Sequence, residues 1–320
     1  MTTLDEQRLM TKIAKMYIEW GWNQTDIARQ LGISQATVSR LFKRAKEVGI
    51  IRISVTVPVG VYADLEGELI RKFSLKDAIV VDTMGEDENQ IMRDIGAAAA
   101  YYLENVIRDH EVIGISSWSS TLLAMIDAMH PIPAKKGVTV VQILGGIGNP
   151  SAEIHATRLT SRLANLVNGT AVFLPAPGIV GSVAALQVLL QDQYVHEALS
   201  LIDKVTLALV GIGSIEPSRL LTLSGNVFSQ EEQNYLRDHG AVGDILLHFY
   251  DIHGRPVDSS LDNRVISMQL EQLRRTERSV GIAGGPRKYQ GILGALNGHW
   301  INVLITDRTT AEKLVSNTAT

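Results

Sequence analysis

Short apolar runs recur along most of the chain and are separated by helical stretches, and this repeat most constrains the fold. The runs are rich in Val, Ile and Leu without polar alternation, a pattern typical of strands buried on both faces of a parallel sheet. The helices between them would cover those faces, so the sequence predicts an α/β domain with a Rossmann-like, mostly parallel sheet. The expected strands are Ala78–Val81, Val112–Ile115, Val138–Ile143, Ala171–Leu174, Val205–Val210, Asp244–Phe249, Ser279–Ala283 and Ile301–Ile305.

Hydroxyl-bearing residues gather where the second of these strands ends. Small-molecule sites in parallel sheets lie in the crevice at the carboxyl ends of the strands. Amides and hydroxyls at a helix start there favour a phosphate or a polyhydroxyl ligand, and Trp118 offers a flat wall for a sugar ring. Ordinary serine capping of a helix is the alternative. The candidate ligand-binding residues of this loop are Ser116, Ser117, Trp118, Ser119, Ser120 and Thr121.

Two charged residues are further candidates for the same site. Asp244 opens a predicted strand, and Lys288 lies at a predicted helix start. An acid and a cation near strand ends could hold a sugar hydroxyl and a phosphate respectively. An unrelated pair of surface charges is the alternative.

Residues 1–57 carry a different pattern, with three short helices in succession. An apolar stripe predicts a first helix ending at Gly21, and Gln24-Thr25-Asp26 is expected to cap a second helix that Gly32 ends. Ser34 is expected to cap a third helix, Gln35 to about Lys46. Two short helices joined by a tight turn are typical of a helix-turn-helix, and the alternation over Ile50–Val55 adds a wing. The first stripe comprises Ile13, Met16, Tyr17, Trp20 and Trp22.

The outward face of the third helix carries polar and basic residues without an acidic one. In a helix-turn-helix the start of this helix enters the major groove, which assigns Gln35, Ala36 and Thr37 to base edges. Gln24 and Thr25 would contact the backbone at the start of the second helix. A helical subdomain with a solvated basic face is the alternative. The remaining residues, assigned mainly to phosphate, are Ser39, Arg40, Lys43 and Arg44.

Charge divides the chain in the same way. Residues 1–57 hold nine Lys/Arg and five Asp/Glu, whereas residues 58–320 hold 21 and 29. A basic head on an acidic body is consistent with a DNA-binding domain, 1–57, joined by a linker helix (Tyr62–Phe73) to a ligand-binding and oligomerisation domain, 58–320. Cysteine is absent, as are a secretory signal and a membrane-spanning run, so we expect a cytoplasmic protein without disulfides.

Nucleotide and metal sites are not expected. The segment Gly145-Gly146-Ile147-Gly148 lacks the Gly-x-Gly-x-x-Gly spacing of dinucleotide-binding loops. The eight histidines are scattered without paired ligand spacing. We therefore predict no cofactor and no metal.

An ordered series of short segments extends over nearly the whole chain: Gln24–Ala28, Val38–Leu41, Pro175–Pro177, Val210–Gly213, Ala241–Ile245 and Ala283–Gly285. Through these segments the chain resembles the SorC family of sugar-binding transcriptional regulators. The resemblance implies a body akin to the sugar-phosphate isomerase and CoA-transferase fold, and tetramers built as pairs of dimers on palindromic DNA. It also implies a small sugar, polyol or sugar phosphate as effector, bound by the Ser116–Thr121 loop, Asp244 and Lys288.

The sequence therefore predicts a regulator of a carbohydrate operon that is not an enzyme. The main alternative is an active sugar-phosphate isomerase or deaminase with Asp244 as the proton-transferring base. The sequence places no second carboxylate or histidine beside those loops, which disfavours it. A structural or interaction protein that does not bind DNA is a third possibility.

Overall fold

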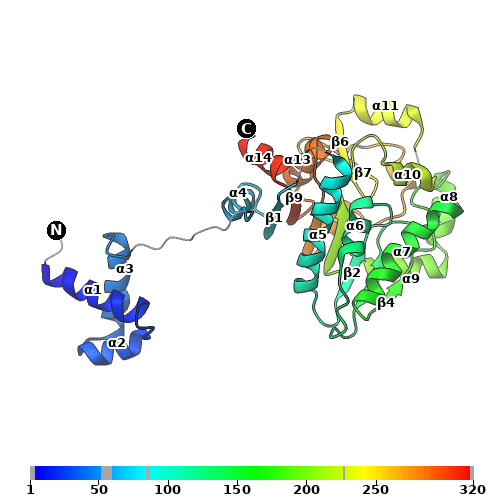
Figure 1. Ribbon diagram of the computed structural model, residues 1–320. Coiled ribbons are helices and arrows are strands. Elements are labelled where there is room, and N and C mark those ends of the chain that lie inside the picture. Colours follow the sequence, from blue (N-terminus) through cyan, green and yellow to red (C-terminus); the bar gives the residue numbers. More distant parts are fainter. Residues whose placement is uncertain (1–3, 52–59, 84, 86, 226–227, 318–320) are drawn as a thin grey trace. The chain divides into compact units, whose positions relative to one another are not determined.

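The structure, a computed structural model, describes residues 4–51, 60–83, 85, 87–225 and 228–317. The chain divides into two compact units, Met1–Pro58 and Val59–Thr320. Figure 1 shows the elements of both units. None of the helices in the described residues is long and apolar enough to cross a membrane.

The first unit contains α1 (Leu4–Ile18), α2 (Gln24–Leu31) and α3 (Gln35–Glu47). Gly32 ends α2 with a φ of 67°, a left-handed conformation that glycine adopts at low cost. As predicted, Ser34 caps α3, and its hydroxyl oxygen accepts a hydrogen bond from the amide of Thr37. The three helices enclose a small apolar core formed by Met10, Ile13, Ile27, Val38, Leu41 and Ala45.

Three details of this unit depart from the sequence predictions or lie beyond test. The cap of α2 is Asn23, one residue before the predicted Gln24-Thr25-Asp26 segment. Its side-chain oxygen accepts a hydrogen bond from the amide of Asp26 at 2.9 Å. Tyr17 and Trp20 are 40% and 55% exposed, since α1 ends at Ile18 and only its inner face packs. The predicted wing strand Ile50–Val55 lies largely outside the described residues.

The second unit contains a seven-stranded sheet in the order β1-β9-β8-β5-β2-β3-β4, with every neighbouring pair parallel. Seven of the eight expected strands are in this sheet, and the exception is Asp244–Phe249. The direction of strand addition reverses between β2 and β5, since β3 follows on one side of β2 and β5 lies on the other. This switch point is where the loops at the strand ends separate to leave room for a ligand. The strands are β1 (Asp77–Val81), β2 (Val112–Ile115), β3 (Thr139–Gln142), β4 (Thr170–Val172), β5 (Leu207–Gly211), β8 (Arg278–Ile282) and β9 (Val303–Asp307).

Helices cover both faces of the sheet, which explains the uninterrupted apolar strands. Ala208 and Val210 of β5 face one core, whereas Leu207 and Leu209 face the other. The second core is completed by α5 (Glu88–Val106), α6 (Ser120–Ala128) and α7 (Pro150–Leu166), which Figure 1 shows along the sheet. The first is completed by α4 (Ala63–Phe73), α9 (Gln193–Ile202), α12 (Leu270–Arg275), α13 (Tyr289–Asn297) and α14 (Arg308–Ser316).

The expected strand Asp244–Phe249 is wrong as a member of the parallel sheet. The segment folds as an antiparallel hairpin of β6 (Ala241–Ile245) and β7 (His248–Asp251), separate from the main sheet. Its turn residues Leu246 and Leu247 have φ values of 56° and 68°. Such turns normally use Asn or Gly, so two buried leucines carried no turn signal in the sequence. The remaining elements are α8 (Val183–Leu190), α10 (Arg219–Ser224), α11 (Gln230–Asp238) and the 3-10 helices η1 (Asp262–Arg264) and η2 (Pro286–Lys288).

Candidate functional site

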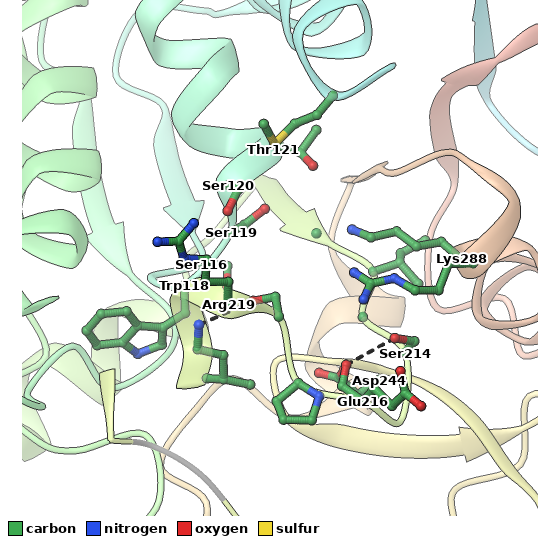
Figure 2. Close-up of a pocket in the computed structure, with 18 of the residues that line it drawn as sticks. Ser116, Trp118, Ser119, Ser120, Thr121, Ser214, Glu216, Arg219, Asp244 and Lys288 are labelled. Atoms are coloured by element: carbon green, nitrogen blue, oxygen red, sulfur yellow. Dashed lines mark hydrogen bonds between the residues drawn. The ribbon is translucent and has the colours of Figure 1, made fainter. Parts of the chain in front are cut away.

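A cavity of about 300 Å³ lies at the carboxyl ends of the central strands. Its walls come from the loops after β2, β5 and β8, from the β6–β7 hairpin and from the start of α5. These loops flank the switch point between β2 and β5, where the parallel topology favours ligand binding. Figure 2 shows Ser119 and Ser120 on one side of the cavity and Lys288, whose side chain extends toward its centre, on the other.

The loop after β2 supplies hydroxyl groups as it turns into α6. Ser119 caps α6, and its hydroxyl oxygen accepts from the amide of Leu122 at 3.3 Å. An added Cβ at Gly211 would lie 2.7 Å from this oxygen, so glycine at the end of β5 makes room for the loop. Ser116, Ser119, Ser120 and Thr121 all line the cavity, as the sequence predicts for a ligand-binding loop.

Ser117 and Trp118 depart from the expected role of this loop. Ser117 is absent from the cavity lining and fully buried, and its hydroxyl donates to the carbonyl of Leu144. Trp118 borders the cavity but is only 6% exposed, and its Nε1 donates to the carbonyl of Gly145 at 2.9 Å. In Figure 2 the Trp118 ring lies away from Lys288. Both side chains therefore fix the loop to the strand-end segment after β3 rather than present a broad surface to a ligand.

The β6–β7 hairpin places Asp244 at the cavity through close backbone packing. A Cβ at Gly213 would lie 1.9 Å from Oδ1 of Asp244, and one at Gly243 would lie 2.6 Å from Cα of Gly291. These contacts leave no space for larger residues, so glycine at Gly213, Gly243 and Gly291 lets the hairpin dock against α13 and the loop after β5. The amide of Leu247 then donates to Oδ2 of Asp244 at 3.0 Å and holds the carboxylate in place.

Asp244 and Lys288 both line the cavity, so the structure brings the two predicted charged residues into one site. Burial raises the pKa of Asp244 to about 6, although the Leu247 amide and the charges of Lys288 and His248 act in the opposite direction. Burial and the charge of Arg287 lower the pKa of Lys288, whereas Asp244 and Glu88 oppose that shift. Near pH 7 the site thus presents a mostly ionised carboxylate that can accept hydrogen bonds from hydroxyl groups.

Seven polar lining residues were missed from the sequence, two of them serines. Glu88 and Asn89 start α5, and Arg287 lies 3.5 Å from Glu88 in an ion pair. Arg287 directly precedes Lys288 in a glycine-rich segment, and this position could have identified it as a further cavity residue. Of the remaining two charged residues, Glu216 comes from the loop between β5 and α10, which has no motif, and Arg219 is the first residue of α10. With Lys288 the cavity has three cationic side chains, which suit a phosphate or several hydroxyl groups.

The first unit presents its predicted DNA-binding residues as a surface on α3 and at the start of α2. Gln35, Ala36, Ser39, Arg40 and Lys43 are exposed, as is Thr25, while Gln24 and Thr37 are half-buried. Thr37 also contacts Ser34, with their hydroxyl oxygens 2.8 Å apart. Arg44 is exposed but forms an ion pair with Glu6 of α1 at 2.7 Å. It would therefore reach a phosphate only by leaving or sharing that carboxylate.

Comparison with known proteins places both units among regulators. Residues 58–316 match the family described as "Putative sugar-binding domain", and residues 3–50 match the homeodomain-like domain family. The sorbitol operon regulator of Klebsiella pneumoniae is 33% identical over 317 residues, covering 98% of this chain and 100% of that protein. The deoxyribonucleoside regulator of Bacillus subtilis is 33% identical over 313 residues, covering 98% and 99%.

A solved structure extends the likeness to the fold. The crystal structure of the full-length sorbitol operon regulator SorC from Klebsiella pneumoniae superposes with a TM-score of 0.72 at 33% identity. The superposition covers 97% of this chain and 98% of that one. The similarity therefore spans the helical head and the α/β body together.

The buried carboxyl group of Asp244 predicts a specific pH dependence of stability. Its pKa rises from 3.8 to about 6 on folding, so the folded state binds this proton more tightly than the unfolded chain. The free energy of unfolding, measured relative to Asp244→Asn, should fall by roughly 2 kcal/mol between pH 4 and pH 7. Urea denaturation of both proteins across this range measures it. A difference that is flat, or that grows as pH rises, would contradict the buried placement of Asp244.

Proposed function

The chain belongs to the SorC family of sugar-binding transcriptional regulators, and from this membership we propose that a small carbohydrate bound in the cavity controls how the helix-turn-helix holds operator DNA. The observation that carries the proposal is the joint placement of hydroxyls, Asp244 and Lys288 around one cavity. The regulated genes would be a carbohydrate-utilisation operon.

The chemistry of the cavity supports a sugar, polyol or sugar phosphate as effector. The Asp244 carboxylate would accept hydrogen bonds from ligand hydroxyls, and the hydroxyls of Ser119 and Ser120 would contact the same groups. Lys288 would neutralise a phosphate, with Arg287 and Arg219 at the edge of the cavity. The cavity volume of about 300 Å³ suits a molecule of monosaccharide size.

At the DNA end, α3 would lie in the major groove. Gln35, Ala36 and Thr37 at its start would contact base edges, and Arg40 and Lys43 would contact phosphates. Ser39 and Arg44 would add phosphate contacts, and Gln24 and Thr25 would meet the backbone at the start of α2. An effector that prefers one arrangement of the protein would then change operator affinity by its differential binding.

Oligomerisation is part of the proposal. Helix α8 carries no charged residue and has no buried one, and Val188 is 69% exposed. Tyr194, at the start of α9, is 70% exposed. Such an apolar surface supports contact between copies, and a tetramer built as a pair of dimers would present the paired heads that a palindromic operator requires. We place this regulator in the cytoplasm, with no cofactor, no metal and no membrane partner.

The enzyme alternative deserves a direct test because the cavity contains two carboxylates that the sequence did not place there. Glu88 and Glu216 line it together with Asp244. We propose binding without turnover, since relatives are named as regulators. Turnover of a sugar phosphate by the purified protein, abolished in Asp244→Asn, would favour the isomerase or deaminase alternative.

A ligand screen tests the effector proposal. Pentoses, hexoses, tetritols and their phosphates are compared by thermal shift, and a true effector should raise the melting temperature with increasing concentration. Lys288→Ala should weaken a phosphorylated binder by about tenfold or more, because a charge-assisted contact to the phosphate is lost. The exposed Lys204 lies outside the cavity, so Lys204→Ala is the matched control. Equal binding by both variants would refute the assigned role of Lys288.

Fluorescence anisotropy with specific and scrambled DNA at two salt concentrations tests the DNA surface. Gln35→Ala should reduce discrimination between the two sequences by about 1 to 3 kcal/mol. Arg40→Ala should weaken both complexes similarly and lower the salt slope by about one. Lys12→Ala, an exposed change on α1, should alter neither measurement. If Gln35→Ala weakened binding to both sequences equally, Gln35 would not contact base edges.

A further inference from the structure

One carboxylate joins the effector cavity to the C-terminal helix. Asp307, at the end of β9, is 1% exposed, and its Oδ2 accepts from the amide of Gly285 at 2.7 Å and from the hydroxyl of Thr310 at 2.6 Å. Its Oδ1 accepts from the amide of Thr310 at 2.9 Å and so caps α14. The same side chain thus holds a cavity loop and begins a helix.

The cavity loop, Gly284–Lys288, cannot move far unless Asp307 moves with it. An added Cβ at Gly284 would lie 2.4 Å from Oδ2 of Asp307, and Gly284 itself lines the cavity. Gly285 has a φ of 90°, a conformation that side chains rarely adopt. Arg287 and Lys288 follow in the same loop, so a ligand that moves these cations also moves the backbone that Asp307 grips.

The far end of α14 is fastened to α4. The Nζ atom of Lys72 donates to the carbonyls of Leu314 at 2.9 Å and Val315 at 3.0 Å, and also to the carbonyl of Asn317. These carbonyls lie at the C-terminal end of the helix, where they carry its negative dipole end. Lys72 therefore attaches α4 to the last turn of α14 through charge-assisted hydrogen bonds.

A second contact fastens the two helices near their starts. The guanidinium group of Arg308, the first residue of α14, lies over the ring of Tyr62 at 5.8 Å. Tyr62 immediately precedes α4, so α4 meets α14 near both of its ends, and Figure 1 shows the two helices side by side. In the sequence, α4 is the first helix after the DNA-binding unit.

We propose that α14 connects the Gly284–Lys288 loop to α4, with Asp307 as the positioning residue at the cavity end and Lys72 as the positioning residue at the α4 end. The proposal rests on the proposed function, since it names the route by which ligand in that cavity reaches the segment leading to the DNA-binding unit. A nine-residue helix with ties at both ends transmits a displacement as a rigid body, whereas a loop would absorb it.

A hydrogen-exchange cycle on the full-length protein tests the connector without carbohydrate or DNA. Gly285→Ala strains the cavity loop, because alanine is disfavoured at a φ of 90°. In the wild-type background this change should speed exchange of the amides of residues 63–73 by roughly two- to thirtyfold, the range that coupled residues show. In the Lys72→Met background the same change should speed exchange clearly less, because only the Arg308–Tyr62 contact then joins the two helix ends.

Lys76→Met is the matched control. The Nζ atom of Lys76 also donates to a backbone carbonyl, that of Glu277 at 2.6 Å, but this carbonyl does not belong to α14. The effect of Gly285→Ala should persist in the Lys76→Met background. If Gly285→Ala does not fold, Thr310→Val replaces it, because the change removes the hydroxyl that contacts Asp307 while keeping the side-chain shape.

The outcomes separate the connector from the effector proposal. An increase in exchange that needs Lys72 but not Lys76 supports the connector, whatever the ligand screen finds. No increase in the wild-type background, or the same increase in the Lys72→Met background, overturns it. Failure of every carbohydrate to bind would instead count against the proposed function, because the exchange cycle uses none.

Discussion

In a parallel sheet all strands have their carboxyl ends at the same edge. Helices cover both faces of the sheet, so polar loops can gather only at such an edge. Here the order β1-β9-β8-β5-β2-β3-β4 separates the loops after β2 and β5 at the switch point. The hydroxyl loop, the glycines after β5 and the cationic loop after β8 meet there as a result. The cavity is thus a consequence of topology, and its chemistry is set by what each loop carries.

The hairpin adds what the sheet alone does not supply, a half-buried and desolvated acid. Asp244 is held by the amide of Leu247 in a turn that places two leucines at positive φ, a conformation that costs free energy. A carboxylate there is also desolvated, which raises its pKa. Strain and desolvation in one place are typical of a functional site, since a ligand hydroxyl can compensate for part of the lost hydration.

Periodicity, caps and strand-end position predicted the helix-turn-helix and seven parallel strands. The meeting of the Ser116–Thr121 loop with Asp244 and Lys288 was instead an expectation from the resemblance to the SorC family, because the residues alone left open an unrelated pair of surface charges. The sequence did not predict the hairpin, since a short segment rich in apolar residues looks the same in a central strand and in a buried turn. Nor could it tell that Ser117 points into the core, because a count of hydroxyls does not say which face each one takes. Glu216 lies in a loop without a motif and Arg219 begins the short helix α10, so only the folded chain brings them to the cavity.

The family relationship gives this chain a DNA-binding head and a sugar-binding body. We propose that operator binding and effector binding are thermodynamically coupled. Coupling of binding sites is reciprocal, so the factor by which an effector changes operator affinity must equal the factor by which the operator changes effector affinity. Calorimetric titration of the effector into the free protein and into its operator complex measures this directly. We predict two affinities that differ by the factor found in DNA-binding assays. An effector that binds equally well in the presence and absence of bound operator would contradict the account.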